Sequence, residues 1–190
     1  MNNSVFLSPH RSRSFQVGAS LIEVLVAILI LSFGMLSLGS MMAYAVQLPK
    51  LAGYRAKAVT LAVEHIERMR ANKGAFQAGT YNEALSYTGK DGTIDNLTGY
   101  DCVYPGCDAT KIAYQDRMYT LRAVRRELPL GGMLVQRDVA SGIDDGNLWI
   151  VWNEPTTFGA LDAANSDNCP AEVAEFTDPK PRCLYVRFKL

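Results

Sequence analysis

Apolar and charged positions are most unevenly distributed in the N-terminal third of the chain. From Val24 to Pro49 no residue is charged, and most residues are Leu, Ile, Val, Met or Ala. A helix of about 25 residues is about 37 Å long, which exceeds the roughly 30 Å hydrocarbon core of a bilayer. A secretory signal peptide has a shorter apolar region and a small-residue cleavage site. The pattern therefore predicts a retained membrane-spanning segment at about residues 22–47.

The apolar stretch continues into an amphipathic pattern. Apolar side chains recur close to helical spacing at Leu51, Tyr54, Ala58, Leu61, Ile66 and Met69. The polar positions between them are Arg55, Lys57, Glu64, Glu67, Arg68 and Arg70. Asn72-Lys73-Gly74 is typical of a helix end, whereas Pro49 favours a kink or a local loosening. We predict one long helix over residues 19–72.

Residues 73–190 have a different periodicity and are expected to form a globular head. Residues 73–113 are rich in Gly, Asn, Asp, Thr and Tyr, which predicts a long connection with short elements. Alternating or continuous apolar positions then predict strands within Tyr114–Leu128, Gly132–Ala140, Asn147–Trp152 and Cys183–Leu190.

The last predicted strand alternates most regularly. Its inward positions are expected to be Leu184, Val186, Phe188 and Leu190, and its outward positions Tyr185, Arg187 and Lys189. Trp149 and Trp152 lie on opposite faces of their strand, so at least one should be in the core. A sheet with one apolar face predicts an α+β fold, in which the second half of the long helix packs on an antiparallel sheet of about four strands.

The distribution of charge singles out Glu23, which lies at the start of the apolar segment. Lys plus Arg and Asp plus Glu both number 19, so no basic excess indicates a nucleic-acid partner. Between Arg13 and Lys50 the only charged side chain is Glu23. A charge at the bilayer centre costs at least roughly 2.5 kcal/mol, so Glu23 is either hydrated at the interface or paired. Basic residues lie on both sides of the span and do not decide its orientation.

The four cysteines all follow the membrane segment, which predicts two disulfides in an oxidising compartment. Their spacings, Cys-x4-Cys and Cys-x13-Cys, differ from those of a zinc site. Three connectivities are possible. We predict the local one, Cys102 with Cys107 and Cys169 with Cys183, because both loops are short to close.

Catalytic and cofactor motifs are not found in the sequence. It has no Walker loop, dinucleotide fingerprint, HExxH motif or nucleophile–base pattern, so we expect no enzyme activity, no cofactor and no metal. His65 has no second ligand at a helical spacing and is expected on the helix surface. The run Asp144-Asp145-Gly146-Asn147 does not match an EF-hand, which favours an acidic turn over a calcium site.

Small residues recur every three positions within the span, at Gly34, Ser37, Ser40 and Ala43. Such a ridge lets helices approach closely, but ordinary membrane-helix composition explains it equally. Both interpretations stay open at this point.

The start of the apolar segment resembles a known family. The motif Gly18-Ala-Ser-Leu-Ile-Glu23-Val follows basic residues and precedes the run Leu25-Val-Ala-Ile-Leu-Ile-Leu. This combination resembles the processing site of type IV pilins. The resemblance implies that a prepilin peptidase cleaves between Gly18 and Ala19, removes the leader 1–18 and methylates the new amine of Ala19. Glu23 would then be the fifth mature residue and would pair with the N-terminal amine of a neighbouring subunit.

Further features of the resemblance concern the type of pilin. Major pilins usually begin with Phe, so Ala19 and the long leader favour a minor subunit. The run SLIEVLVAILIL, the chain length and the four cysteines are most similar to PilV-type minor pilins. The region bounded by Cys169 and Cys183 resembles the disulfide-bounded C-terminal region of pilins, although here a strand follows the second cysteine.

The resemblance also implies a location and partners. We expect a single-pass inner-membrane protein with a periplasmic head, which later enters the pilus filament or its tip. It would help to prime type IV pilus assembly together with other minor pilins, the major pilin and the inner-membrane assembly platform. A type II secretion pseudopilin shares the same helix and processing chemistry and is the first alternative. A membrane-tethered periplasmic adhesin or enzyme is the second.

Overall fold

The computed structural model describes residues 18, 20–90, 102–103, 105–154, 167–177 and 180–190. The rest of the predicted leader and Ala19, on which the processing prediction depends, lie outside the described residues. The chain divides into two units, Met1–Val46 and Gln47–Leu190.

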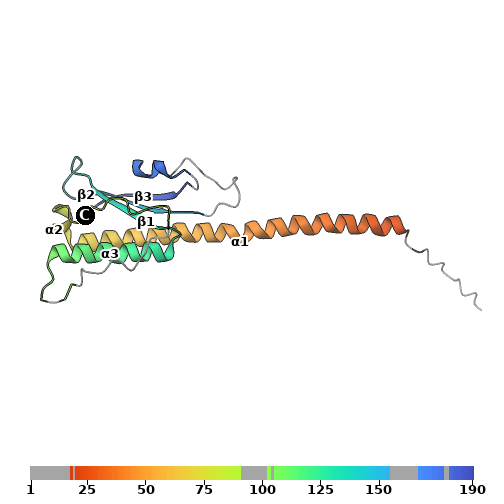
Figure 1. Cartoon of the computed structure of the whole chain (residues 1–190), viewed down its shortest axis with the longest axis horizontal. Coiled ribbons are helices and arrows are strands. Elements are labelled where there is room, and N and C mark those ends of the chain that lie inside the picture. Colours follow the sequence, from red (N-terminus) through yellow and green to blue (C-terminus); the bar gives the residue numbers. More distant parts are fainter. Residues whose placement is uncertain (1–17, 19, 91–101, 104, 155–166, 178–179) are drawn as a thin grey trace, which may run out of the picture. The chain divides into compact units, whose positions relative to one another are not determined.

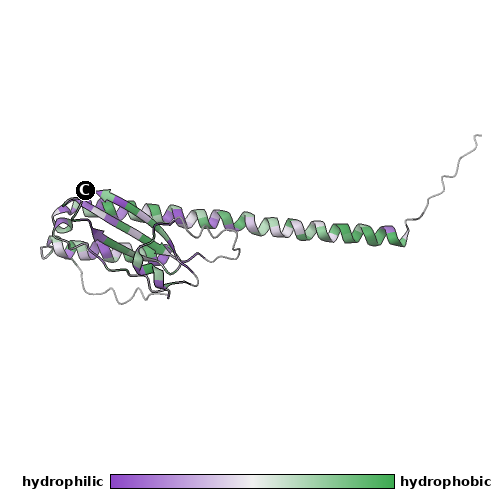
Figure 2. Cartoon of the chain, turned by 90° about the horizontal axis from the view of Figure 1, so that it is seen from above, coloured by the Kyte–Doolittle hydropathy of each residue, from purple (hydrophilic) through white to green (hydrophobic). Residues whose placement is uncertain are grey.

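The described part of the first unit consists mainly of the start of helix α1 (Leu21–Ala71, 51 residues). Figure 2 shows that hydrophobic residues cover this half of the helix almost without interruption. Its large apolar side chains are exposed, and within the described residues α1 is the one helix long and apolar enough to cross a membrane. This half of α1 is compatible with a single-pass membrane anchor. The helix is continuous through Pro49.

The described residues of the second unit form the rest of α1, two further α-helices, a 3₁₀ helix and a sheet. The elements that follow α1 are α2 (Lys73–Gln77), α3 (Ala109–Glu127), β1 (Gly132–Arg137), β2 (Asp145–Trp152), η2 (Ala171–Glu175) and β3 (Arg182–Lys189). The strands form an antiparallel sheet in the order β1-β2-β3, with β2 in the centre. The predicted α+β fold, a long N-terminal helix packed on a small antiparallel sheet, is confirmed.

The segment Tyr114–Leu128, predicted as a strand, is instead part of helix α3. Its alternating stretch is only five residues long, whereas a helical period governs the whole segment. The buried positions are Ala113, Thr120, Leu121, Val124 and Leu128. At the start of α3 the Asp108 carboxylate accepts the backbone N–H of Lys111 at 2.8 Å and caps the helix. The prediction of about four strands is therefore wrong, and the described residues contain a three-stranded sheet.

Helices α1 and α3 lie side by side against one face of the sheet (Figure 1). They are antiparallel, because Asn72 bonds to Ala109 near one end and Lys57 bonds to Glu127 near the other. The main core lies between these helices and the sheet. Its largest fully buried members include Phe76, Met69, Met133, Leu148, Ile150 and Trp152. Full burial of one large apolar side chain contributes roughly 1.5–3 kcal/mol, so this layer provides most of the hydrophobic stabilisation of the unit.

The predicted alternation of the strands is confirmed. Leu148, Ile150 and Trp152 of β2 and Phe188 of β3 belong to the core below the helices, with Leu184, Val186 and Leu190 packed against it. Trp149 lies on the other face, where its ring stacks on Tyr185 with centroids 5.0 Å apart. A smaller cluster on that face contains Tyr87, Val151, Val173 and Cys183. The second face of the sheet is therefore partly covered.

The outer edge of β1 is covered by residues 83–86, which come before α3 in the sequence. The backbone N–H groups of Glu83 and Ser86 donate to the carbonyls of Val135 and Met133 at 2.9 and 3.0 Å. A Cβ atom at Gly132 would lie 2.5 Å from the backbone nitrogen of Tyr87, so only glycine permits this close approach.

Candidate assembly site

The motif around Glu23 lies at the N-terminal end of α1. The carbonyl of Ser20 accepts the backbone N–H groups of Glu23 and Val24 at 2.9 and 3.2 Å, so Ser20 begins the hydrogen-bonded ladder of the helix. Gly18 and Ser20 precede the helix, and Ala19 is outside the described residues. The Glu23 carboxylate lies in the first turn, where the positive end of the helix dipole favours an anion.

This placement has a chemical consequence. Glu23 is exposed and is the one acidic residue of α1 before Glu64. A carboxylate in hydrocarbon is costly, but a cation that shares the low-dielectric environment offsets that cost through a strong Coulomb attraction. Glu23 is therefore an exposed carboxylate at the start of an otherwise uncharged stretch of helix.

The predicted small-residue ridge presents an unobstructed surface. A Cβ atom at Gly34 would meet no atom within 4 Å, and the hydroxyl of Ser40 donates to the carbonyl of Ser37 at 2.8 Å. The Ser40 hydroxyl is satisfied within its own helix, so a neighbouring helix can approach without leaving it unpaired.

His65 is buried, which corrects the prediction that it lies on the helix surface. Its exposed fraction is 0%, and its Nδ1 lies 2.8 Å from Oγ1 of Thr120 on α3. The Thr120 hydroxyl donates to the carbonyl of Asp116, so we assign the proton of the His65–Thr120 bond to Nδ1. Burial, and then the charges of Arg68 and Arg117, lower the pKa of His65 from 6.5 to about 3.

A polar network surrounds this histidine. The Tyr81 hydroxyl donates to Oδ2 of Asp116 at 2.6 Å, and Arg68 donates to Oδ1 of the same carboxylate at 3.3 Å. Burial and the bond to Asp116 raise the pKa of Tyr81. Arg117 forms an ion pair with Glu83. The network connects α1, α3 and the segment that covers β1.

Sequence reasoning missed Asp116 and Thr120 as members of this network, because their segment was predicted as a strand. Two signals indicate the helix. The first is the cap formed by Asp108, three residues before Lys111. The second is the pair of basic residues in the last turn, Arg125 and Arg126, followed closely by Pro129.

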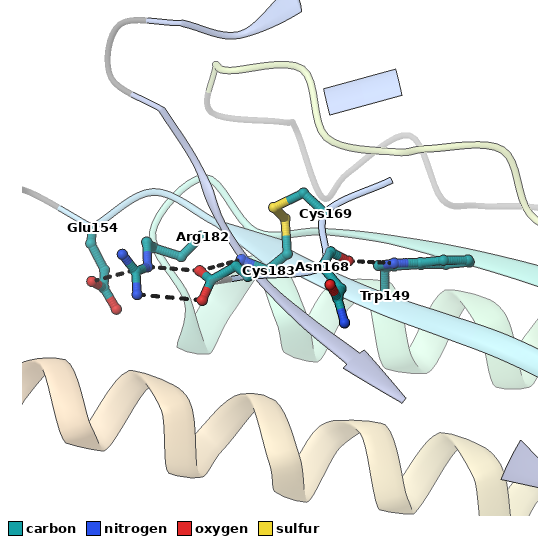
Figure 3. Close-up of a disulfide and its surroundings, with 7 residues drawn as sticks. Trp149, Glu154, Asn168, Cys169, Arg182 and Cys183 are labelled. Atoms are coloured by element: carbon teal, nitrogen blue, oxygen red, sulfur yellow. Dashed lines mark hydrogen bonds and ion pairs between the residues drawn. A yellow bond between two sulfur atoms is a disulfide. The ribbon is translucent and has the colours of Figure 1, made fainter. Parts of the chain in front are cut away.

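The structure contains both disulfides in the local pairing, Cys102–Cys107 and Cys169–Cys183. Figure 3 shows the second one connecting the start of β3 to the segment that precedes η2. Next to it, the Asn168 carbonyl accepts the indole N–H of Trp149 at 2.9 Å. The disulfide and this bond hold residues 168–169 against the sheet.

A buried ion-pair network adjoins the disulfide (Figure 3). Nε of Arg182 lies 2.8 Å from Asp167 Oδ2 and 3.7 Å from Glu154 Oε2. Asp167 also accepts the backbone N–H of Cys183 at 3.3 Å, and Glu154 accepts the indole N–H of Trp152 at 3.3 Å. Only 5% of Arg182 and 4% of Glu154 are exposed, so these buried charges stabilise one another, and Nε of Arg55 on α1 adds a weaker contact 3.9 Å from Oε1 of Glu154.

The acidic run Asp144–Asn147 lies at the start of β2. The Asp144 carboxylate accepts Nζ of Lys73 and Nε2 of Gln77, each at 2.7 Å, and these bonds lower its pKa. This carboxylate therefore fastens the short helix α2 to the sheet. Within the part of the chain that the structure describes, no three His, Cys, Asp or Glu side chains are grouped so as to hold a metal ion.

Comparison with known proteins identifies no relative: no protein-family model, curated protein or solved structure matches this chain.

Proposed function

We propose that this protein is a minor pilin of the PilV type, which is processed by prepilin peptidase and helps to prime type IV pilus assembly. The observation that carries the proposal is the motif from Gly18 to Glu23 at the start of an apolar helix of membrane length. The helix continues into a disulfide-stapled α+β unit without a break.

The proposed assembly step uses Glu23. Cleavage after Gly18 would create a new amine at Ala19, and the Glu23 carboxylate of one subunit would pair with the amine of its neighbour. Two charges that are each unfavourable in lipid become tolerable as a pair, and the pairing sets the relative position of two helices. The proposed cleavage site is N-terminal to the first helical residue, Leu21.

The disulfides support a destination outside the cytoplasm. Both cysteine pairs are in the second unit, and disulfides persist in oxidising compartments such as the periplasm. The proposed topology therefore has the leader in the cytoplasm, one helix in the inner membrane and the second unit in the periplasm. The subunit would then move into the filament or its tip.

A type II secretion pseudopilin is the second candidate, because it would use the same motif, helix and processing chemistry. A clean deletion, scored together for sheared surface pili and for secreted exoproteins, separates the two. We expect loss of pili with normal secretion. Loss of secretion with normal pili would assign the protein to secretion, and normal levels of both would leave a membrane-tethered adhesin or enzyme.

A further inference from the structure

We propose that five cations of the second unit bind the phosphate headgroups of anionic phospholipids where the unit meets the membrane. These residues, the basic collar, are Lys50, Lys57, Arg122, Arg125 and Arg126. The inference rests on the membrane anchor of the proposed function and is independent of the role in the pilus.

The antiparallel packing of α1 and α3 brings the collar together. Lys50 and Lys57 lie in the first turns of α1 within the second unit, and the three arginines lie in the last turns of α3. Nζ of Lys57 lies 2.9 Å from Oε2 of Glu127 on α3. Lys57, Arg122 and Arg126 also line one groove of about 460 Å³ between the two helices. Three collar residues therefore share one groove between α1 and α3, the two helices that lie side by side in Figure 1.

Among the described residues that line the groove, cations outnumber anions: Lys57, Arg68, Arg122 and Arg126 against Glu64 and Glu127. The carboxylate of Glu127 contacts both Lys57 at 2.9 Å and Arg126 at 3.2 Å, so one anion serves two cations. Their hydrogen bonds, Lys57 first, hold the pKa of Glu127 below its usual value. No acidic residue occurs from Gln47 to Val63 or from Arg117 to Arg126. The side chains of Lys57 and Arg126 are 57% and 74% exposed, so they can reach a ligand.

Helix capping does not account for the whole collar. Arg125 and Arg126 in the last turn stabilise the carbonyl end of α3 through its dipole. That role does not extend to Lys50 and Lys57, which belong to another helix, or to Arg122 one turn earlier.

The collar lies close to the end of the uncharged segment. Lys50 follows Pro49 directly, and Lys57 is about 10 Å further along the helix at about 1.5 Å per residue. The screening length at physiological salt is about 8 Å, so an anionic surface at the end of the uncharged segment acts strongly on Lys50 and more weakly on Lys57. Arginine and lysine pair strongly with phosphate, and each basic residue near such a surface raises affinity roughly fivefold.

The test uses the full chain reconstituted into vesicles of phosphatidylethanolamine with a minor fraction of phosphatidylglycerol. After mild extraction in neutral detergent, native mass spectrometry counts the phosphatidylglycerol that the chain retains. The collar variant is Lys57→Gln with Arg126→Gln. The matched control is Arg70→Gln with Lys111→Gln, which removes the same charge from the opposite ends of the same two helices. The collar variant breaks the ion pairs of Lys57 and Arg126 with Glu127, and the control breaks the ion pair of Arg70 with Glu67.

We expect the collar variant, which lacks two cations, to retain roughly 25-fold less phosphatidylglycerol and the control to retain as much as the wild type. Glu127→Gln removes the counter-charge and should raise retention about fivefold, which tests the collar without removing any cation. The proposal would be overturned if the collar variant and the control lost equal amounts of phosphatidylglycerol, or if the collar variant lost none. It would also be overturned if Glu127→Gln retained no more than the wild type. If the collar variant kept its phosphatidylglycerol but no longer bound an acidic protein partner, that result would also overturn the proposal and assign the surface to that partner.

The same samples distinguish failure of the collar from failure of the proposed function. A chain that resists alkaline carbonate extraction but retains no phosphatidylglycerol contradicts the collar alone. A chain that alkaline carbonate removes from the vesicles contradicts the membrane anchor, and with it both proposals.

Discussion

Nδ1 of His65 lies 2.8 Å from Oγ1 of Thr120, and this buried bond joins the long helix α1 to α3. Both residues lie between the helices, out of contact with solvent or nearly so. Since the Thr120 hydroxyl donates to the Asp116 carbonyl, Nδ1 of His65 carries a proton, and burial lowers the pKa of His65 to about 3, so the ring is neutral near pH 7. The helix pair is therefore built around a histidine that is not protonated in the folded state.

Stability should fall as pH drops below about 6.5, because the folded state holds the pKa of His65 at about 3 and the unfolded state does not. Between these values the unfolded state binds the extra proton. The free energy of unfolding should therefore decrease by about 1.4 kcal/mol per pH unit, or about 2 kcal/mol from pH 7 to pH 5. Urea unfolding of the full chain in detergent measures this slope. His65→Gln should remove most of it, and an unchanged slope in that variant would contradict the assignment.

Arg182→Gln should destabilise the second unit by about 3–5 kcal/mol, because it leaves two carboxylates, Glu154 and Asp167, without their shared cation. Arg187→Gln is the matched control. Arg187 lies on the same strand, but its side chain is 55% exposed and its ion pair with Asp138 should contribute less than about 1 kcal/mol. Thermal unfolding of both variants tests the difference, and equal effects would show that the buried network adds no special stability.

Removal of the Cys169–Cys183 disulfide should cost about 3 kcal/mol, since the bond closes a loop with a sequence separation of 14 residues. Removal of Cys102–Cys107, with a separation of 5, should cost roughly 1 kcal/mol less. Paired Cys→Ser variants, compared by melting temperature, test this order. If the Cys169→Ser/Cys183→Ser protein melted at the wild-type temperature, the Cys169–Cys183 disulfide would not stabilise the attachment of β3.

Glu23→Ala should be cleaved like the wild type but should not restore filaments to a deletion strain, because the variant lacks the carboxylate proposed to pair with the neighbouring amine. The mobility of the chain on immunoblots measures processing, and the amount of sheared surface pili measures assembly. Gly18→Leu is the control for processing and should remain uncleaved. Full complementation by Glu23→Ala would mean that charge pairing has no role in assembly.

Gly34→Leu tests the small-residue ridge. A side chain at Gly34 meets no atom within 4 Å, so the substitution should leave the fold of the single chain intact. Incorporation into filaments should fall several-fold if a neighbouring helix approaches this surface closely. Gly39→Leu is a second variant at an equally unobstructed glycine, about 140° around the helix from Gly34 although one turn before Ala43, and it shows whether the effect is specific to the Gly34 position. Equal incorporation of both variants would favour ordinary membrane-helix composition.

Features that depend on strong local patterns were predicted well. The long apolar helix follows from the uncharged segment before Lys50, and β3 follows from the regular alternation of Leu184, Val186 and Phe188. The pairing of Cys169 with Cys183 follows from the low entropy cost of a short loop. Each of these signals is contained within a few neighbouring residues.

Helix α3 was mispredicted because Tyr119–Ala123 fits a period of two as well as a helical face. Its type became clear only from the packing of Leu121 and Val124 against the rest of the core. The error had a second consequence. Without a helix beside α1, nothing covers His65, so the sequence indicated a surface residue there.

The sequence by itself determined the membrane-length helix, the motif at Gly18–Glu23, the apolar faces of β2 and β3 and the short disulfide loops. Periodicity, charge and loop length act between residues close in the chain and need no knowledge of the fold. Only the tertiary structure decided that His65 meets Thr120, that Arg182 joins Glu154 and Asp167, and that the lysines of α1 lie beside the arginines of α3. Those contacts join distant segments, and burial sets their energies because it removes the water that would otherwise solvate each polar group.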